Sequence, residues 1–98
     1  MGQGVPQDTK QAISWFEKAA KLKNDKAMAK LANLYLRGEL LKQDYQKAYQ
    51  WFKQAAQLGN SAAMQSLSYL YQHGLGIAKD LEQASYWQQK VAQLNNIQ

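Results

Sequence analysis

Residues 44–58, DYQKAYQWFKQAAQL, occur in three related copies along the chain, and this repetition indicates the kind of fold. The copies begin at Asp8, Asp44 and Asp80, which are 36 residues apart. Tryptophan, alanine and leucine recur at the same interval, as Trp15, Trp51 and Trp87, Ala12, Ala48 and Ala84, Ala20, Ala56 and Ala92, and Leu22, Leu58 and Leu94. A fixed period of this length indicates an array of stacked units.

Each copy has the spacing of an amphipathic α-helix. In the middle copy Ala48, Trp51, Phe52 and Ala55 follow one another at steps of one to three residues and share one helical face. The aspartate that opens each copy suits an N-cap, because its carboxylate can accept a hydrogen bond from a free backbone N–H. We predict helices over residues 8–23, 44–58 and 80–95, with all three tryptophans in the core. The residues expected to face inward in the first are Ala12, Trp15, Phe16, Ala19 and Leu22.

A second helical pattern separates the copies. Residues 25–37 and 61–73 carry matching apolar arcs and end at Gly38 and Gly74, where a helix C-terminus favours a residue that tolerates positive φ. The arcs consist of Ala27, Met28, Leu31, Leu34 and Tyr35, and of Ala63, Met64, Leu67, Leu70 and Tyr71. The chain is therefore predicted to hold five helices. Leu40 and Leu41, in the loop between two of them, are expected to be buried.

Composition excludes several classes of protein. The chain contains no cysteine, which removes disulfides, thiolate metal sites and cysteine nucleophiles. No apolar run approaches the ~20 residues of a membrane-spanning helix. The first residues, MGQGVPQD, lack the basic flank and the apolar segment of a signal peptide. A hydrophobic content of 46% and three tryptophans indicate one ordered domain over residues 1–98.

Candidate catalytic groups are sparse. The single histidine, His73, falls in the last turn of a predicted helix, where it can interact with the helix C-terminus or with solvent. No nucleophile lies in an evident pair with a base. Gly74 and Gly76 lack the strand, the helix and the lysine of a phosphate-binding loop, and no metal-ligand cluster is present. We predict that the protein is not an enzyme and holds no cofactor or metal.

The net charge of +5 is unevenly distributed. Residues 1–49 hold nine basic side chains against five acidic ones, and residues 50–98 hold three against two. Most of the excess comes from Lys18, Lys21, Lys23, Lys26 and Lys30. A basic patch can attract nucleic acid or an acidic partner, but this segment has no interleaved aromatic residues and no nucleic-acid-binding motif. We interpret it as a solvated corner and do not expect nucleic acid as the partner.

Together these residues resemble the Sel1-like repeat, a short-loop relative of the tetratricopeptide repeat. The family's motif runs Leu-Gly, Tyr, Gly-x-Gly-Val, Asp, Lys-Ala, Trp-Tyr and Lys-Ala-Ala. The last unit fills it with Leu67, Tyr71, Gly74, Gly76, Ile77, Asp80, Ala84, Trp87, Lys90 and Ala92. The resemblance implies an all-α fold, a right-handed α/α superhelical solenoid of antiparallel helix pairs. Its units would be a partial repeat over residues 1–24 and complete repeats over 25–60 and 61–98.

The two ends of the predicted array differ in the polarity of their outer faces. Gln88 and Val91 replace an aromatic residue and an alanine of the motif, which fits a terminal helix with a polar outer face. Residues 2–8 look like the end of a unit whose first helix is missing. We therefore expect a longer parent array, or a homo-oligomer that covers Trp15 and Ala19.

An exposed stripe is predicted on the helices at 25–37 and 61–73. By resemblance, tetratricopeptide-like solenoids hold a protein or peptide on the concave surface that such helices line, and the small rotation between repeats creates that surface. The predicted contact residues are Lys30, Asn33, Arg37, Ser66, Tyr69 and His73. Tyrosine and arginine are enriched among binding anchors, and the cations favour an acidic partner.

Two alternatives stay open for this stripe. It can be a merely solvated surface without a partner. Some relatives of the family are described as related to the cell wall, so the chain can also be a cell-wall or polysaccharide-associated binding module. Exposed aromatic residues flanked by carboxylates would favour that reading, and Tyr69 is its one candidate.

Overall fold

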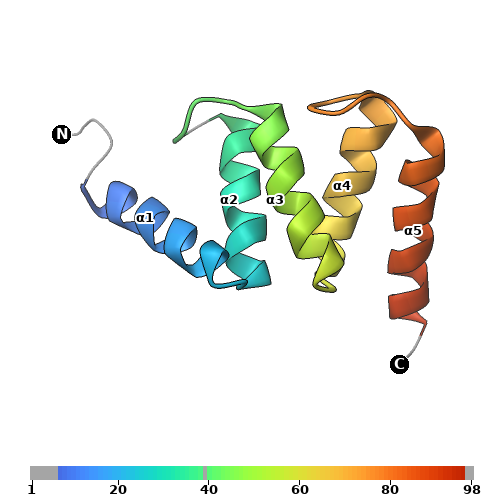
Figure 1. Ribbon diagram of the computed structural model, residues 1–98, viewed down its shortest axis with the longest axis horizontal. Coiled ribbons are helices and arrows are strands. Elements are labelled where there is room, and N and C mark those ends of the chain that lie inside the picture. The colour runs from blue at the N-terminus through green and yellow to red at the C-terminus, as the bar shows by residue number, and fades with distance from the viewer. Residues whose placement is uncertain (1–6, 39, 97–98) are drawn as a thin grey trace.

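The computed structural model describes residues 7–38 and 40–96, with side chains from Thr9 onward. The described chain forms five α-helices and no strand, in an elongated array of 45 × 29 × 21 Å. The helices are α1 (Gln7–Lys21), α2 (Asp25–Arg37), α3 (Tyr45–Gln57), α4 (Ser61–His73) and α5 (Leu81–Asn95). Successive helices run in opposite directions and lie side by side along the array (Figure 1). The prediction of an all-α solenoid of antiparallel helix pairs is confirmed.

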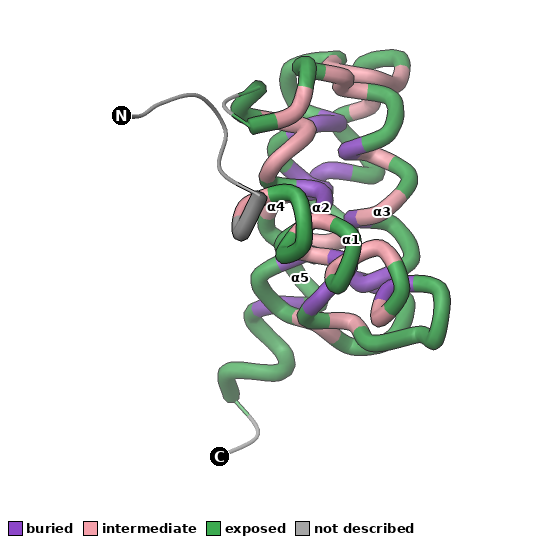
Figure 2. Tube along the Cα trace, turned by 90° about the vertical axis from the view of Figure 1, so that its left-hand side faces the viewer, coloured by how far each residue is buried: buried purple, intermediate pink, exposed green. Residues whose placement is uncertain are grey.

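The helices form two layers with the core between them. Figure 2 places α2 and α4 on one side of the molecule and α3 on the other, with buried residues between them. We call α2 and α4 the first helices of their units, and α1, α3 and α5 the second helices. The two helices of a unit therefore pack against each other, and the unit also packs against the next unit.

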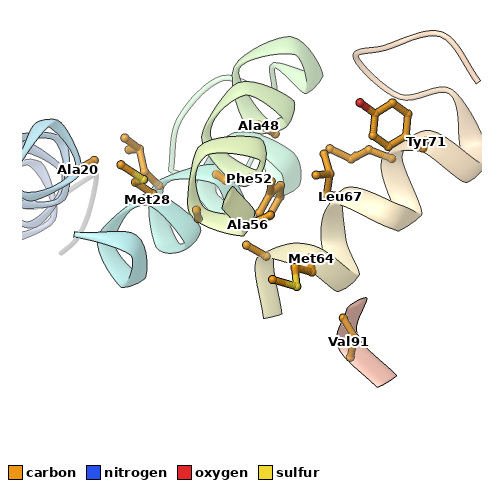
Figure 3. Packing of buried hydrophobic residues seen from close by; sticks show 14 of the residues in the cluster. Ala20, Met28, Ala48, Phe52, Ala56, Met64, Leu67, Tyr71 and Val91 are labelled. Atoms are coloured by element: carbon orange, nitrogen blue, oxygen red, sulfur yellow. The ribbon is translucent and has the colours of Figure 1, made fainter. Parts of the chain in front are cut away.

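The core is a continuous cluster that runs along the array. Phe52 is 1% exposed, and Figure 3 shows it on α3 beside Met64 and Leu67 of α4. All five residues of the predicted arc in α4 are buried, as are Ala27, Met28 and Leu31 of the arc in α2. Burial of an apolar side chain contributes about 1.5–3 kcal/mol, so this seam supplies the main favourable term in the folding free energy.

Polar N-caps fix where four of the helices begin. Asp44 accepts a hydrogen bond from the backbone N–H of Lys47 at 3.1 Å, and Asp80 accepts from those of Glu82 and Gln83. Both predicted aspartate caps are confirmed. Asn24 and Asn60 cap α2 and α4 in the same way. Helix α1 begins at Gln7, one residue before the predicted aspartate cap, whose side chain lies outside the described residues.

Asn60 also ties the two first helices together. Its Oδ1 accepts from the backbone N–H of Ala63 at 2.8 Å, while its Nδ2 donates to Oδ2 of Asp25 at 2.9 Å. We expect Asn60→Ala to lower the free energy of unfolding by about 2 kcal/mol, the sum of a lost cap and a lost hydrogen bond to a charged group. Asn24→Ala removes a cap alone and should cost about 1 kcal/mol. Urea denaturation of both variants measures the difference, and equal losses would show that the contact with Asp25 contributes nothing.

Two hydroxyl groups of α4, on the buried residues Ser68 and Tyr71, add polar contacts with neighbouring helices. Ser68 Oγ donates to the carbonyl oxygen of Ala84 at 2.8 Å, which joins α4 to α5. The hydroxyl oxygens of Tyr49 and Tyr71 lie 2.9 Å apart and join α3 to α4. Burial, together with this hydrogen bond and the nearby carboxylate of Asp80, raises the pKa of Tyr71 well above its usual range. Tyr71 is therefore a neutral structural residue at physiological pH.

Several apolar residues that the pattern predicts to be buried are exposed. Trp15 is 72% exposed. Helix α2 covers the equivalent Trp51, whereas no described helix covers Trp15 in that way. Trp51 and Trp87 are half-buried, so the prediction of three core indoles is wrong for the first and only partly right for the others. Leu22 lies in the turn after α1 and Leu40 in the loop after α2, and both are exposed, whereas Leu41 packs against the core.

Candidate interaction surface

The predicted contact residues lie on the outer surface of the first helices. We call this surface the A face and define it by Lys26, Lys30, Asn33 and Arg37 of α2 with Ala62, Ser66, Tyr69 and His73 of α4. All of them are exposed except Ser66, which is half-buried. Residues three and four positions apart share one side of a helix, so the two columns are set by helix geometry. The exposure predicted for Tyr69 is observed, at 50%.

A hollow of about 560 Å³ occupies the α2 half of the A face. Its lining includes three of the predicted residues, Lys30, Asn33 and Arg37. The others come from three helices and one cap: Phe16, Lys26, Ala29, Leu34, Asn60 and Ala62. An apolar floor with a cationic and amide rim can take an apolar side chain next to an acidic one.

The α4 half of the A face is aromatic and uncharged by comparison. The rings of Tyr69 and His73 lie 4.3 Å apart and are tilted by 52°. Ser66, Tyr69 and His73 do not line the hollow, so the structure does not gather all six predicted residues into one pocket. The side chain beside Tyr69 is a histidine, whereas the polysaccharide alternative called for flanking carboxylates.

Sequence reasoning missed Phe16, Leu34 and Asn60 as part of this surface. Leu34 and Phe16 match Leu70 and Phe52 one period later, and those residues are fully buried. The pattern therefore marks Leu34 and Phe16 as core. They reach the surface because the α1 end of the array has fewer covering helices than its middle.

Neither a metal-ligand cluster nor a membrane-spanning helix is found among the described residues. Within residues 7–38 and 40–96, no group of three or more histidine, cysteine, aspartate or glutamate side chains could hold a metal ion. Among the helices that the structure describes, none has the length and apolar character of a membrane-spanning segment.

The sequence matches the family described as Sel1 repeat over residues 1–24, 25–60 and 61–96. No curated protein matches the chain significantly. Among solved structures, the chain is similar to a Sel1 repeat protein from Oxalobacter formigenes, with a TM-score of 0.81 and 32% identity over 84% of this chain and 63% of that one.

Two further structures share the architecture. One is cysteine-rich protein B of Helicobacter pylori, with a TM-score of 0.82 and 25% identity over 93% of this chain and 66% of that one. The other is a protective antigen present in uropathogenic Escherichia coli strains that displays an SLR fold, with a TM-score of 0.86 and 36% identity. It is aligned over 97% of this chain but only 20% of its own length. The chain thus spans between 20% and 66% of the length of these three proteins.

Proposed function

Because the chain belongs to the Sel1 repeat family, we propose that its A face binds a protein or peptide partner with acidic side chains. Proteins of this family commonly serve as scaffolds for protein–protein interactions and are generally not catalysts. The finer assignment, to the A face and to an acidic partner, is our own. It depends above all on one observation, the hollow lined by Lys30, Asn33 and Arg37 beside the exposed Tyr69.

The charge of this surface supports an acidic partner. Three cations, Lys26, Lys30 and Arg37, border one hollow with an apolar floor. Cations that are free to pair across an interface speed association and select against basic partners. The side chains of Tyr69 and Arg37 supply the types of contact that dominate interface energetics. A ligand that crosses both halves would place its acidic part on α2 and its apolar or aromatic part on α4.

The test is a double substitution on the A face, Arg37→Glu with Tyr69→Ala. Loss of about 2 kcal/mol or more from two anchors corresponds to a roughly 30-fold weaker complex. The protein, carried on beads, would capture partners from a lysate, and mass spectrometry would quantify each one. We expect the double variant to lose its acidic partners without a significant fall in melting temperature, because both side chains are exposed.

The chain offers a matched control on another surface. Tyr86 and Lys90 of α5 are also an exposed tyrosine and an exposed cation, with Lys90 Nζ 5.6 Å from the centre of the Tyr86 ring. The control Tyr86→Ala with Lys90→Glu should capture the same partners as the unaltered protein. Equal capture by the A-face variant and this control would reject the A face. A parallel pull-down on polysaccharide beads tests the alternative.

A further inference from the structure

His73 and Arg37 occupy the same position in successive units. They are 36 residues apart, each is the last residue of a first helix, and each is exposed. A glycine in the left-handed conformation follows both, and its backbone N–H donates to the carbonyl oxygen of Leu34 in α2 and of Leu70 in α4. The repeat therefore places a guanidinium, which stays charged at physiological pH, in one unit and a titratable imidazole at the equivalent point of the next.

The two halves of the A face differ in charge, and the protonation of His73 changes that difference. The α2 half has three cations, whereas His73 is the one residue of the α4 half that can become a cation. The rings of His73 and Tyr69 lie 4.3 Å apart, a distance at which an aromatic ring attracts a cation over its face. Proton uptake would therefore extend the cationic surface from α2 to α4, beside the tyrosine proposed as an anchor.

Other charged or titratable groups lie at this end of the helix layers. They are Arg37 of α2, Tyr49 of α3, and Lys79 and Asp80 of the loop before α5. Asp80 donates its backbone N–H to the carbonyl oxygen of Tyr71, and the Tyr49 hydroxyl lies 2.9 Å from that of Tyr71. Among these side-chain types and histidine, only imidazole ordinarily changes its charge between about pH 5 and 8. The chain contains one histidine and no cysteine, so we assign a change in binding over this range to His73.

We infer that proton uptake by His73 tightens the binding of acidic ligands to the A face, so that this surface responds to pH. The inference rests on the function proposed above and adds its regulation. At acidic pH both α2 and α4 present cations to the ligand, whereas at alkaline pH only α2 does. One exposed charge pair changes an affinity by about two- to fivefold at low salt, and this sets the size of the expected effect.

The probe is a synthetic peptide of four Asp-Asp-Phe units, with blocked ends and a rhodamine label that is insensitive to pH. A matched peptide of four Asn-Asn-Phe units carries no charge. Aspartate ordinarily titrates near pH ~3.9, so the acidic peptide keeps its charge at both pH values of the experiment. Fluorescence anisotropy, with the whole chain at constant low ionic strength, measures the affinity for each peptide at about pH 5.5 and about pH 7.5.

We expect the acidic peptide to bind about two- to fivefold more tightly at the lower pH, with a difference that shrinks as salt screens the charges. The neutral peptide should show no such change. His73→Arg installs the residue of the preceding unit and should bind the acidic peptide tightly at both pH values, whereas His73→Gln should bind it weakly at both. His73→Gln with Gln88→His moves the single histidine to an exposed site on α5, outside the A face, and should not restore the pH dependence.

The variant Arg37→Glu with Tyr69→Ala separates this inference from the proposed function. If the acidic peptide does not bind, or binds this variant as tightly as the unaltered chain, the A face is not the site and both proposals fail. If binding depends on the A face but has the same affinity at both pH values, or keeps its pH dependence in His73→Gln, only the role of His73 is overturned. Far-UV circular dichroism at both pH values checks that each variant stays folded.

Discussion

Replacing Phe52 with alanine is expected to lower the free energy of unfolding by about 3–5 kcal/mol, the cost of emptying a buried aromatic site. Phe52 is 1% exposed within the continuous core, and Figure 3 shows its ring against α4. Small domains are stable by only about 5–15 kcal/mol, so this one change would remove a large part of the total. Urea denaturation followed by far-UV circular dichroism measures the loss.

The repeat supplies the control for this prediction. Phe16 is the same residue one period earlier, but it is half-buried. Phe16→Ala should therefore cost less, about 1–2 kcal/mol. Equal losses at the two sites would mean that the exposure of α1 seen in the structure does not hold in solution, because some other element would have to cover Phe16.

Gly76→Ala is expected to be the most damaging change in any loop of the array. A Cβ atom at Gly76 would overlap the backbone carbonyl of Tyr45, at the start of α3. The loop between α4 and α5 would therefore have to move away from the start of α3 in the previous unit. An alanine at φ of +75° would also strain the backbone. That strain alone costs about 1–2 kcal/mol, and the steric overlap should raise the total to about 3 kcal/mol or more.

Gly74→Ala separates strain from overlap. Gly74 has a similar φ of +67°, but its Cβ would meet the side chain of Lys79 at an ordinary 3.4 Å. We expect Gly74→Ala to cost about 1–2 kcal/mol, the strain alone. Thermal and urea denaturation of the two variants compare them directly. Equal destabilisation would show that the contact between the loop and Tyr45 is unimportant.

The prediction from sequence succeeds wherever a feature depends on neighbours within a turn or two. The period of 36 residues gives the five helices, Asp44 and Asp80 give caps, and Gly38 and Gly74 give left-handed helix ends. The exposure of Lys30, Arg37 and Tyr69 follows from their helical positions in the same way. All these properties are local, so the order of residues is enough to specify them.

The candidate site depends on more than the order of residues. The hollow that joins Lys30, Asn33 and Arg37 to Phe16 and Ala62 arises where three helices meet. The hydrogen bond between Asn60 and Asp25 also links residues 35 positions apart. Neither contact can be read from a periodic pattern, because the pattern gives the face of each helix but not the distance to the next one.

The order of residues alone specifies a solenoid of paired helices, because each copy of the motif encodes its own helix, its caps and its apolar face. Which copy of that face is buried depends on how the helices pack in three dimensions. Trp15 and Trp51 occupy equivalent positions, yet Trp15 is 72% exposed and Trp51 is half-buried. Burial requires a second helix on the same face, and α3 has α2 there, whereas no described helix covers the equivalent face of α1.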